Sequence, residues 1–246
     1  MKKIVLLLVL VCVFSCQEKE KEVLSAQDIV DRSITVSGGN LYEEREISFR
    51  FRERTYISKH INGHKVLKRI TKNDSAEVID VKTNTGFTRS MNDSLVQLSD
   101  SMANKYANSV NSVHYFAKLP YGLNDQAVNK EYLGETEMND TVYYKIKITF
   151  DQEGGGEDFE DTYVYWFNKE TLKPDYLAYI FHVDGGGLRF RKAYNERYVN
   201  GIRFVDYENY RAKDTDASII SIDSLYMKGE LELLSKIELK DILVNS

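Results

Sequence analysis

Cysteine is nearly absent from this chain of 246 residues, in which only Cys12 and Cys16 occur. Both lie within the first sixteen residues, and Cys12 falls in a segment that we expect to be removed. The mature chain would then keep a single thiol, which excludes an internal disulfide. We therefore expect neither a cysteine nucleophile nor a cysteine metal site.

Proline is equally scarce, with two residues, and no low-complexity linker interrupts residues 26 to 243. Internal repeats are also missing. The length fits one large domain or two small ones, and all-β folds of this size commonly form one unit. We therefore expect residues 26–246 to form a single domain.

The motifs of common enzymes are missing as well. The chain has no Gly-x-Ser-x-Gly elbow, and none of its four histidines stands in a His-Glu-x-x-His pattern. His60 and His64 are four residues apart, but Asn62-Gly63 between them predicts a hairpin turn that sends the two imidazoles to opposite faces. The sequence thus predicts no enzymatic activity, no metal centre and no cofactor.

Three glycines, residues 154 to 156, lie among acidic residues and lack the Lys-Ser or Lys-Thr that closes a phosphate loop. The carboxylates between Asp151 and Asp161 leave open a Ca²⁺ site, although their spacing is not that of an EF-hand. We favour a solvated hairpin tip.

Positive charge is in deficit, since 33 Lys and Arg face 38 Asp and Glu, for a formal net charge of −5. Removal of Lys2 and Lys3 with the first fifteen residues changes this charge to −7. Nucleic acid is therefore not an expected partner, because its binding requires a clustered basic surface.

What the chain does have is an export signal at its start. Met1 to Lys3 is basic, Ile4 to Phe14 is apolar, and Ser15 precedes Cys16. The apolar run is too short to span a bilayer, which needs about 20 residues, and the order is that of a signal peptide covering residues 1–15. The segment from residue 13 to Cys16 resembles the lipobox of bacterial lipoproteins, which implies lipidation of Cys16. An ordinary signal peptide cut at a nearby site is the alternative.

Residues 16–25 are predicted to form a lipidated, flexible tether, because residues 17–22 offer no apolar side chain to bury. Acidic residues just after a lipidated cysteine resemble, in some Gram-negative phyla, a signal for transfer to the cell surface. A plain spacer is the alternative. We expect a lipid-anchored protein of the outer membrane, on the periplasmic face or on the cell surface.

Two helices are predicted from apolar periodicity and end signals. Ser25 is the expected N-cap of the first, and Gly38-Gly39 ends it. The second covers Ser99 to Leu119 and is terminated by Pro120 and Gly122. Its apolar residues recur at three- and four-residue spacings: Met102, Tyr106, Val110, Val113 and Phe116.

Strands are predicted where polar and apolar residues alternate, beginning with Ile47, Phe49 and Phe51. The hairpin turn at Asn62-Gly63 leads into a returning strand. The further expected strands are Val66 to Thr71, Glu77 to Lys82, Thr85 to Arg89, Asp140 to Phe150, Thr162 to Phe167, Asp175 to Val183, Leu188 to Val199, Ile202 to Tyr210 and Leu231 to Leu243.

This order of elements predicts a mainly β fold with some helix. The antiparallel sheet either closes into a barrel or curls into a half-barrel covered by the N-terminal and mid-chain helices. The leading helix before Ile47-Ser48-Phe49, together with the lipobox, resembles the lipoprotein-carrier superfamily of LolA and LolB. That resemblance covers roughly residues 26 to 243 and implies a helix-covered half-barrel that holds acyl chains.

Aromatic side chains fall on successive strands and give the main functional hint. They either fill the core or line a ligand cleft. For the second case the candidate ligand-binding wall residues are Phe49, Phe51, Tyr144, Tyr165, Phe181 and Phe190.

Two functions follow as hypotheses. The first is a membrane-anchored carrier that binds a hydrophobic small molecule, an acyl chain, a lipid or a lipoprotein between sheet and helices. The second is a non-enzymatic interaction lipoprotein with a filled core, which presents a surface to an envelope protein partner.

Overall fold

The computed structural model describes residues 24–155, 159–182, 185–213 and 216–245. The predicted signal peptide, Cys16 and residues 17–23 of the predicted tether lie outside the described residues. So do residues 156–158 of the acidic loop.

Helix α1 (Ala26–Ser37) begins and ends where the sequence predicted. The Asp28 backbone N–H donates to Ser25 Oγ, and the Ser25 backbone N–H donates to the Asp28 carboxylate, which together form a capping box. Gly38 ends the helix with φ at 139°, a conformation that favours glycine. The predicted first helix is confirmed.

Antiparallel strands in the described part of the chain form two sheets of seven. The first sheet has the order β14 (Lys240–Asn245), β1 (Glu46–Phe51), β2 (Arg54–Ile61), β3 (His64–Lys72), β4 (Glu77–Thr83), β5 (Gly86–Met91) and β6 (Ser94–Leu95). The predicted turn at Asn62-Gly63 is confirmed, with positive φ at both residues and His60 opposite Lys65.

The second sheet is a meander, in which neighbouring strands are also consecutive in the sequence. Its order is β13 (Leu231–Ile237), β12 (Ile202–Ala212), β11 (Gly187–Val199), β10 (Pro174–Phe181), β9 (Thr162–Asn168), β8 (Thr141–Phe150) and β7 (Val128–Met138). The sequence did not predict β7, because this edge strand is mostly exposed and carries few apolar residues to alternate.

The chain passes from one sheet to the other between β13 and β14. We predicted a single strand from Leu231 to Leu243, and this is wrong, because polar contacts hold a corner at Leu239. The Leu239 N–H donates to Asp206 Oδ1 at 2.9 Å, and Arg197 Nη2 donates to the Leu239 carbonyl oxygen at 2.8 Å. The two sheets therefore follow one another around a corner without closing, and the predicted half-barrel is confirmed.

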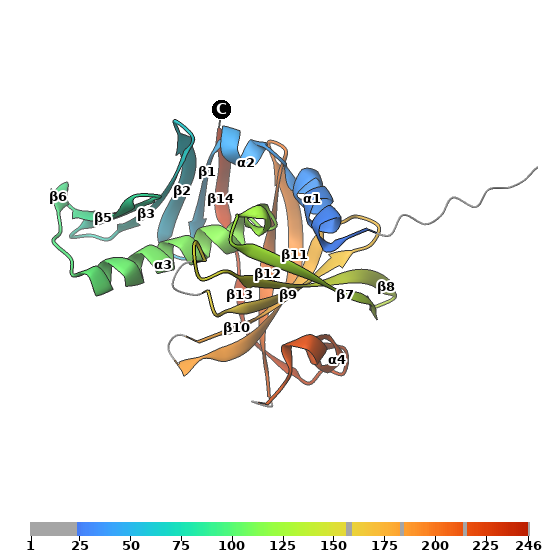
Figure 1. Ribbon diagram of the computed structural model, residues 1–246. Helices are drawn as coiled ribbons and strands as arrows, with labels where there is room; N and C mark the ends of the chain where they lie inside the picture. Colours follow the sequence, from blue (N-terminus) through green and yellow to red (C-terminus); the bar gives the residue numbers. More distant parts are fainter. Residues whose placement is uncertain (1–23, 156–158, 183–184, 214–215, 246) are drawn as a thin grey trace, which may run out of the picture.

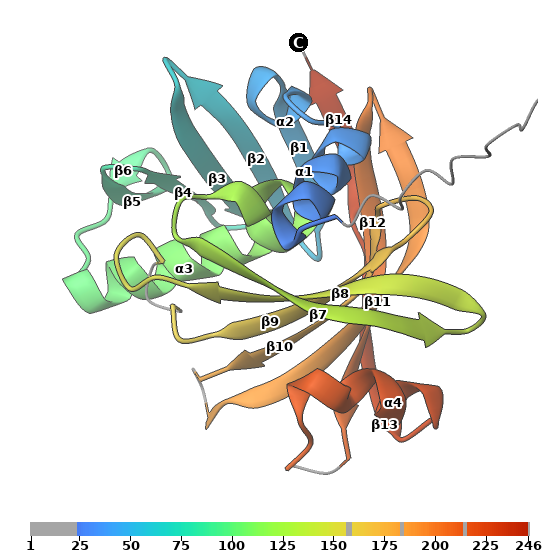
Figure 2. The ribbon, with the colours of Figure 1, turned by 45° about the vertical axis from the view of Figure 1, so that its right-hand side comes forward.

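Helices fill the inside of this curl and cover part of its outside. The helices are α1, α2 (Leu41–Glu44), α3 (Asp100–Ala117) and α4 (Ile222–Met227), with 3₁₀ turns η1 (Tyr121–Asn124) and η3 (Ile219–Ser221). Figure 1 shows α3, the predicted mid-chain helix, running from the β5–β6 end of the first sheet toward the second sheet. Figure 2 shows α1 and α4 on opposite sides of the second sheet.

The central strand β9 of the second sheet is buried on both faces, which explains its run of aromatic residues. On β9, Tyr163, Tyr165 and Phe167 face α1 and α3, whereas Val164 and Trp166 face α4. The Trp166 Nε1–H donates to an Asp223 carboxylate oxygen of α4 at 3.0 Å. A strand covered on both sides needs apolar residues at every position, so its burial is continuous.

Candidate functional site

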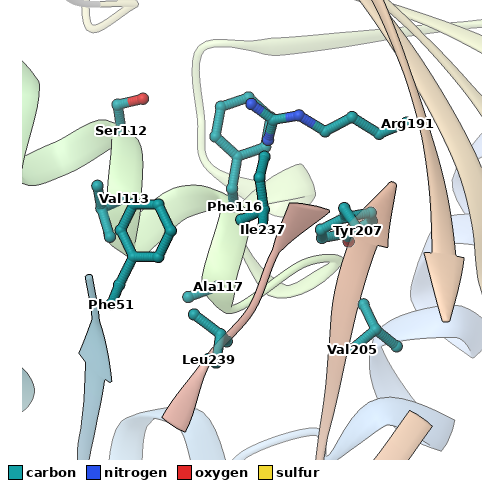
Figure 3. Close-up of a pocket in the computed structure, with 10 residues that line it drawn as sticks. All are labelled: Phe51, Ser112, Val113, Phe116, Ala117, Arg191, Val205, Tyr207, Ile237 and Leu239. Atoms are coloured by element: carbon teal, nitrogen blue, oxygen red, sulfur yellow. The ribbon is translucent and has the colours of Figure 1, made fainter. Parts of the chain in front are cut away.

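A small apolar cleft lies where the C-terminal half of α3 meets β1 and the second sheet (Figure 3). We call it the α3 cleft, and its volume is about 100 Å³. The residues that line it are Phe51, Ser112, Val113, Phe116, Ala117, Arg191, Val205, Tyr207, Ile237 and Leu239.

The regular spacing of each element brings these side chains together. Ser112 and Val113 lie one turn before Phe116 and Ala117 on α3, so all four share one helix face. Val205 and Tyr207 alternate on β12 and point to the same side of the sheet. The cleft is the space that these apolar faces leave unfilled between them.

Arg191 is the charged residue of the α3 cleft. It is 8% exposed, and its guanidinium carbon lies 3.9 Å from the centre of the Phe116 ring. Its Nη2 donates to the Tyr179 hydroxyl at 2.8 Å. The buried Nε–H has no hydrogen-bond partner, and no described carboxylate lies within ion-pair distance of Arg191. The cleft is thus an apolar space with one buried, incompletely bonded cation.

The predicted wall residues are distributed differently from what the sequence indicated. Phe51 lines the α3 cleft. Phe49 packs in the core against Tyr56, with ring centres 5.4 Å apart. Tyr165 is fully buried, and its hydroxyl lies 2.9 Å from that of Tyr115. Tyr144 lies at the margin of the core, 5.4 Å from the Lys169 ammonium.

The remaining two wall candidates also lie away from the cleft. Phe190 is on the opposite face of β11 and stacks on Tyr226 of α4 at 4.8 Å. Phe181 lies beneath the Arg189 guanidinium at 5.0 Å. The structure therefore brings only Phe51 of the six residues to this cleft, and ligand contact by the other five stays a prediction without a shared cavity to support it.

Sequence reasoning missed Arg191, although a signal for it was present. Adjacent residues of a strand point to opposite faces, so Arg191 faces the interior because Phe190 faces α4. To find Arg191 from the sequence, one would have to know that α3 covers the face of β11 that carries Ala193 and not the face that carries Phe190.

The other side of α3 carries two buried basic groups. His114 is 1% exposed, its Nε2–H donates to the Lys68 carbonyl oxygen at 3.2 Å, and its ring meets Phe49 edge-on. Burial lowers the pKa of His114 to about 3. Burial, with the nearby charge of Lys65, lowers the pKa of Lys118 to about 7. The packing of α3 therefore lowers the pKa of both groups, and both lose their protons more readily than usual.

His114 should make the fold sensitive to acid. The unfolded chain binds a proton at His114 below a pH of about 6.5, whereas the folded chain does not until about pH 3. Stability from this group is complete above pH 6.5 and falls on acidification by up to about 1.4 kcal/mol per pH unit. We expect His114→Phe to flatten this dependence between pH 6 and pH 4.

The measurement is the urea midpoint of each full-length chain across that pH range. Loss of the hydrogen bond to Lys68 affects the variant at every pH alike, so only the slope is informative. His64→Phe, on the exposed hairpin, should retain the wild-type slope. An unchanged slope in His114→Phe would contradict the prediction.

No group of three or more His, Cys, Asp or Glu able to hold a metal occurs among the described residues. None of the helices in the described part of the chain is long and apolar enough to cross a membrane.

Similar folds occur in solved structures. A LolA superfamily protein from Nitrosomonas europaea is 13% identical, with a TM-score of 0.48 and coverage of 91% of this chain and 95% of that one. A DUF1329 family protein from Desulfovibrio piger is 12% identical, with a TM-score of 0.41 and coverages of 89% and 92%. A putative outer membrane lipoprotein-sorting protein domain from Vibrio parahaemolyticus is 8% identical, with a TM-score of 0.40 and coverages of 83% and 100%.

The first of these proteins belongs to the superfamily that the sequence resembles. No curated protein matches the sequence. The chain belongs to DUF6503, a family of unknown function whose model matches residues 2–239.

Proposed function

We propose that this chain is a lipid-anchored protein of the bacterial envelope that binds a hydrophobic ligand in the α3 cleft. The observation that carries the proposal is the unfilled apolar space between α3 and the second sheet. The ligand is an acyl chain, a lipid or the lipid part of a lipoprotein. It is bound and released without chemical change, so the role is non-enzymatic.

The anchor and the location come from the sequence. Cys16 would carry acyl chains that insert into the outer membrane, with the folded part on the periplasmic face or on the cell surface. A ligand-binding cleft tethered to a membrane meets lipids directly. The names of a lipoprotein-sorting domain and of a LolA superfamily protein among the similar structures agree with an envelope role.

Binding in the cleft would be driven by burial of apolar surface. Phe51, Val113 and Leu239 offer aliphatic and aromatic contacts, worth about 25 cal/mol per Å² before the costs of association. The volume of about 100 Å³ is below the roughly 300–1,000 Å³ of pockets that enclose a whole drug-sized ligand. The cleft as it stands accommodates one end of a ligand.

The small volume of the α3 cleft also favours the second hypothesis, that of an interaction lipoprotein. A molecule whose interior is nearly filled would serve as an interaction lipoprotein that presents a surface to an envelope partner. The two functions differ in one measurable respect, because only the first requires lipid contact at the residues of the α3 cleft.

Filling the cleft should remove ligand binding. A photoactivatable diazirine fatty acid is added to isolated membranes that contain the full chain, after lipidation is complete, and the labelled peptides are mapped. We expect labelling of the peptide that contains Val113, reduced about tenfold in Val113→Trp. A tenfold loss of affinity corresponds to the free energy of burying about 60 Å² of apolar surface.

Asn104→Trp places the same indole on the exposed, N-terminal part of α3 and is expected to label like the wild type. Ser112→Trp, at the exposed edge of the cleft, replaces Val113→Trp if overpacking unfolds the latter. Wild-type chains that acquire no label at the cleft would overturn the carrier proposal and leave the interaction lipoprotein.

A further inference from the structure

Arg191 differs from the other buried arginines of the described chain in having no anionic partner. Arg69 pairs with Asp80 at 2.6 Å, and Arg203 pairs with Glu196 at 2.6 Å. Arg191 is as well buried, yet its guanidinium rests on aromatic rings and donates to one neutral hydroxyl. The α3 cleft therefore holds a positive charge that this part of the protein does not balance.

Deprotonation cannot relieve this imbalance. A lysine in a similar position can lose its proton, as the lowered pKa of the buried Lys118 illustrates, but an arginine stays charged in proteins. The ring contacts with Phe116 and Tyr179 stabilise the cation in part. They leave the Nε–H without an acceptor, and an unmade hydrogen bond in a buried site costs free energy.

We propose that Arg191 binds the anionic head group of a single-chain amphiphile whose alkyl chain occupies the α3 cleft. The proposal rests on the function proposed above and specifies the ligand class. The Nη protons of the guanidinium that are not donated to Tyr179 supply charge-assisted hydrogen bonds to an oxygen of the head group. The first methylenes then contact Phe116 and Val113, and the rest of the chain extends beyond the small cavity.

Tyr207 adds a second donor on the same side. It lines the cleft and is 4% exposed. Burial raises the pKa of its hydroxyl, so the group keeps its proton and can donate to an anion. A carboxylate or a phosphate monoester satisfies both donors, whereas an ammonium group would face repulsion from Arg191.

The test compares diazirine probes with one alkyl chain and four heads: carboxylate, phosphate, alcohol and amine. Each is added to membranes that contain the full chain, and labelling of the cleft is normalised to total probe in the membrane. We expect the better anionic probe to label at about 10- to 100-fold lower concentration than the alcohol, the range for a hydrogen bond to a charged group. Whether carboxylate or phosphate is better distinguishes fatty acids from phospholipid-derived ligands.

In Arg191→Met, the anionic probes should fall to the level of the alcohol, whose labelling should not change. Arg191→Lys should restore part of the preference. Arg189→Met is the matched control, because Arg189 lies two residues away on the same strand face, beside Phe181, and should keep the full preference. The melting temperature of Arg191→Met should not fall, since a buried charge without an ionic partner is removed.

Equal labelling by anionic and neutral probes in the wild type would overturn the proposal, as would a preference that survives in Arg191→Met. If no probe labels the wild-type cleft, the proposed function itself fails. The two failures are thus distinct.

Discussion

Asp80→Asn is expected to destabilise the protein by about 3–5 kcal/mol, the cost of leaving buried charges without their partner. Asp80 of β4 is 1% exposed and accepts hydrogen bonds from Arg69 and from Arg89 at 2.6–3.0 Å. A neutral amide would leave two guanidinium groups uncompensated between the first sheet and α3.

The same cluster holds α3 in place. Arg69 Nη1 donates to Ser109 Oγ at 2.8 Å, and the Arg89 guanidinium lies 3.4 Å from the centre of the Tyr106 ring. We therefore expect the N-terminal half of α3 to become accessible to protease in Asp80→Asn. This half begins at Asp100 and lies on β3, β4 and β5.

Urea-dependent proteolysis of the full chain measures both effects. The control is Asp241→Asn, which breaks an exposed pair with Arg50 and should cost no more than about 1 kcal/mol. Equal midpoints for the two variants would show that the buried cluster does not stabilise the fold.

Cys16→Ala is expected to abolish lipidation and to leave the protein either as a soluble chain or trapped as the uncleaved precursor. The expectation follows from the basic head, the apolar run and the small residue before Cys16. Each methylene buried in the bilayer contributes about 0.8 kcal/mol, so two or three acyl chains hold a protein firmly. Removing the thiol removes every such chain.

Cys12→Ala is a matched control within the same segment, because Cys12 belongs to the apolar run and should not be lipidated. Its product should remain with the membrane after high-salt and carbonate washing. Retention of Cys16→Ala chains that have lost residues 1–15, after the same washes, would refute lipid anchoring through this residue.

Local signals were sufficient to predict helices α1 and α3. Ser25 and Ser99 both act as N-caps, and Gly38 ends α1, because capping depends on residues only a few positions apart. The hairpin at Asn62-Gly63 was predictable for the same reason.

Features that depend on distant residues were not predictable. The corner at Leu239 requires Asp206, 33 positions away, so the sequence of 231–243 alone reads as one strand. α4 was missed because Ile222 is buried only by contact with β9 to β11.

In the candidate site, too, local features were predictable and features that depend on distant residues were not. The helix face that includes Val113 and Phe116 was predicted from its periodicity, but the partner face was not. The alternation of side chains along β11 shows which residues share a face of the strand. Only the complete fold shows which face α3 covers. Phe190 was therefore chosen as a wall residue and Arg191 was overlooked.

The corner at Leu239 has a consequence for how the protein forms. β14 pairs with β1 through Glu46 and Asn245, which stand at opposite ends of the folded chain. Until residues 240–245 have been synthesised, one edge of β1 has no neighbour, and the first sheet lacks the strand that follows β13 of the second sheet. Assembly must then wait for contacts of long sequence separation, which form slowly. A chain that delays its final structure in this way stays unfolded for longer, which would suit the export across a membrane that we propose.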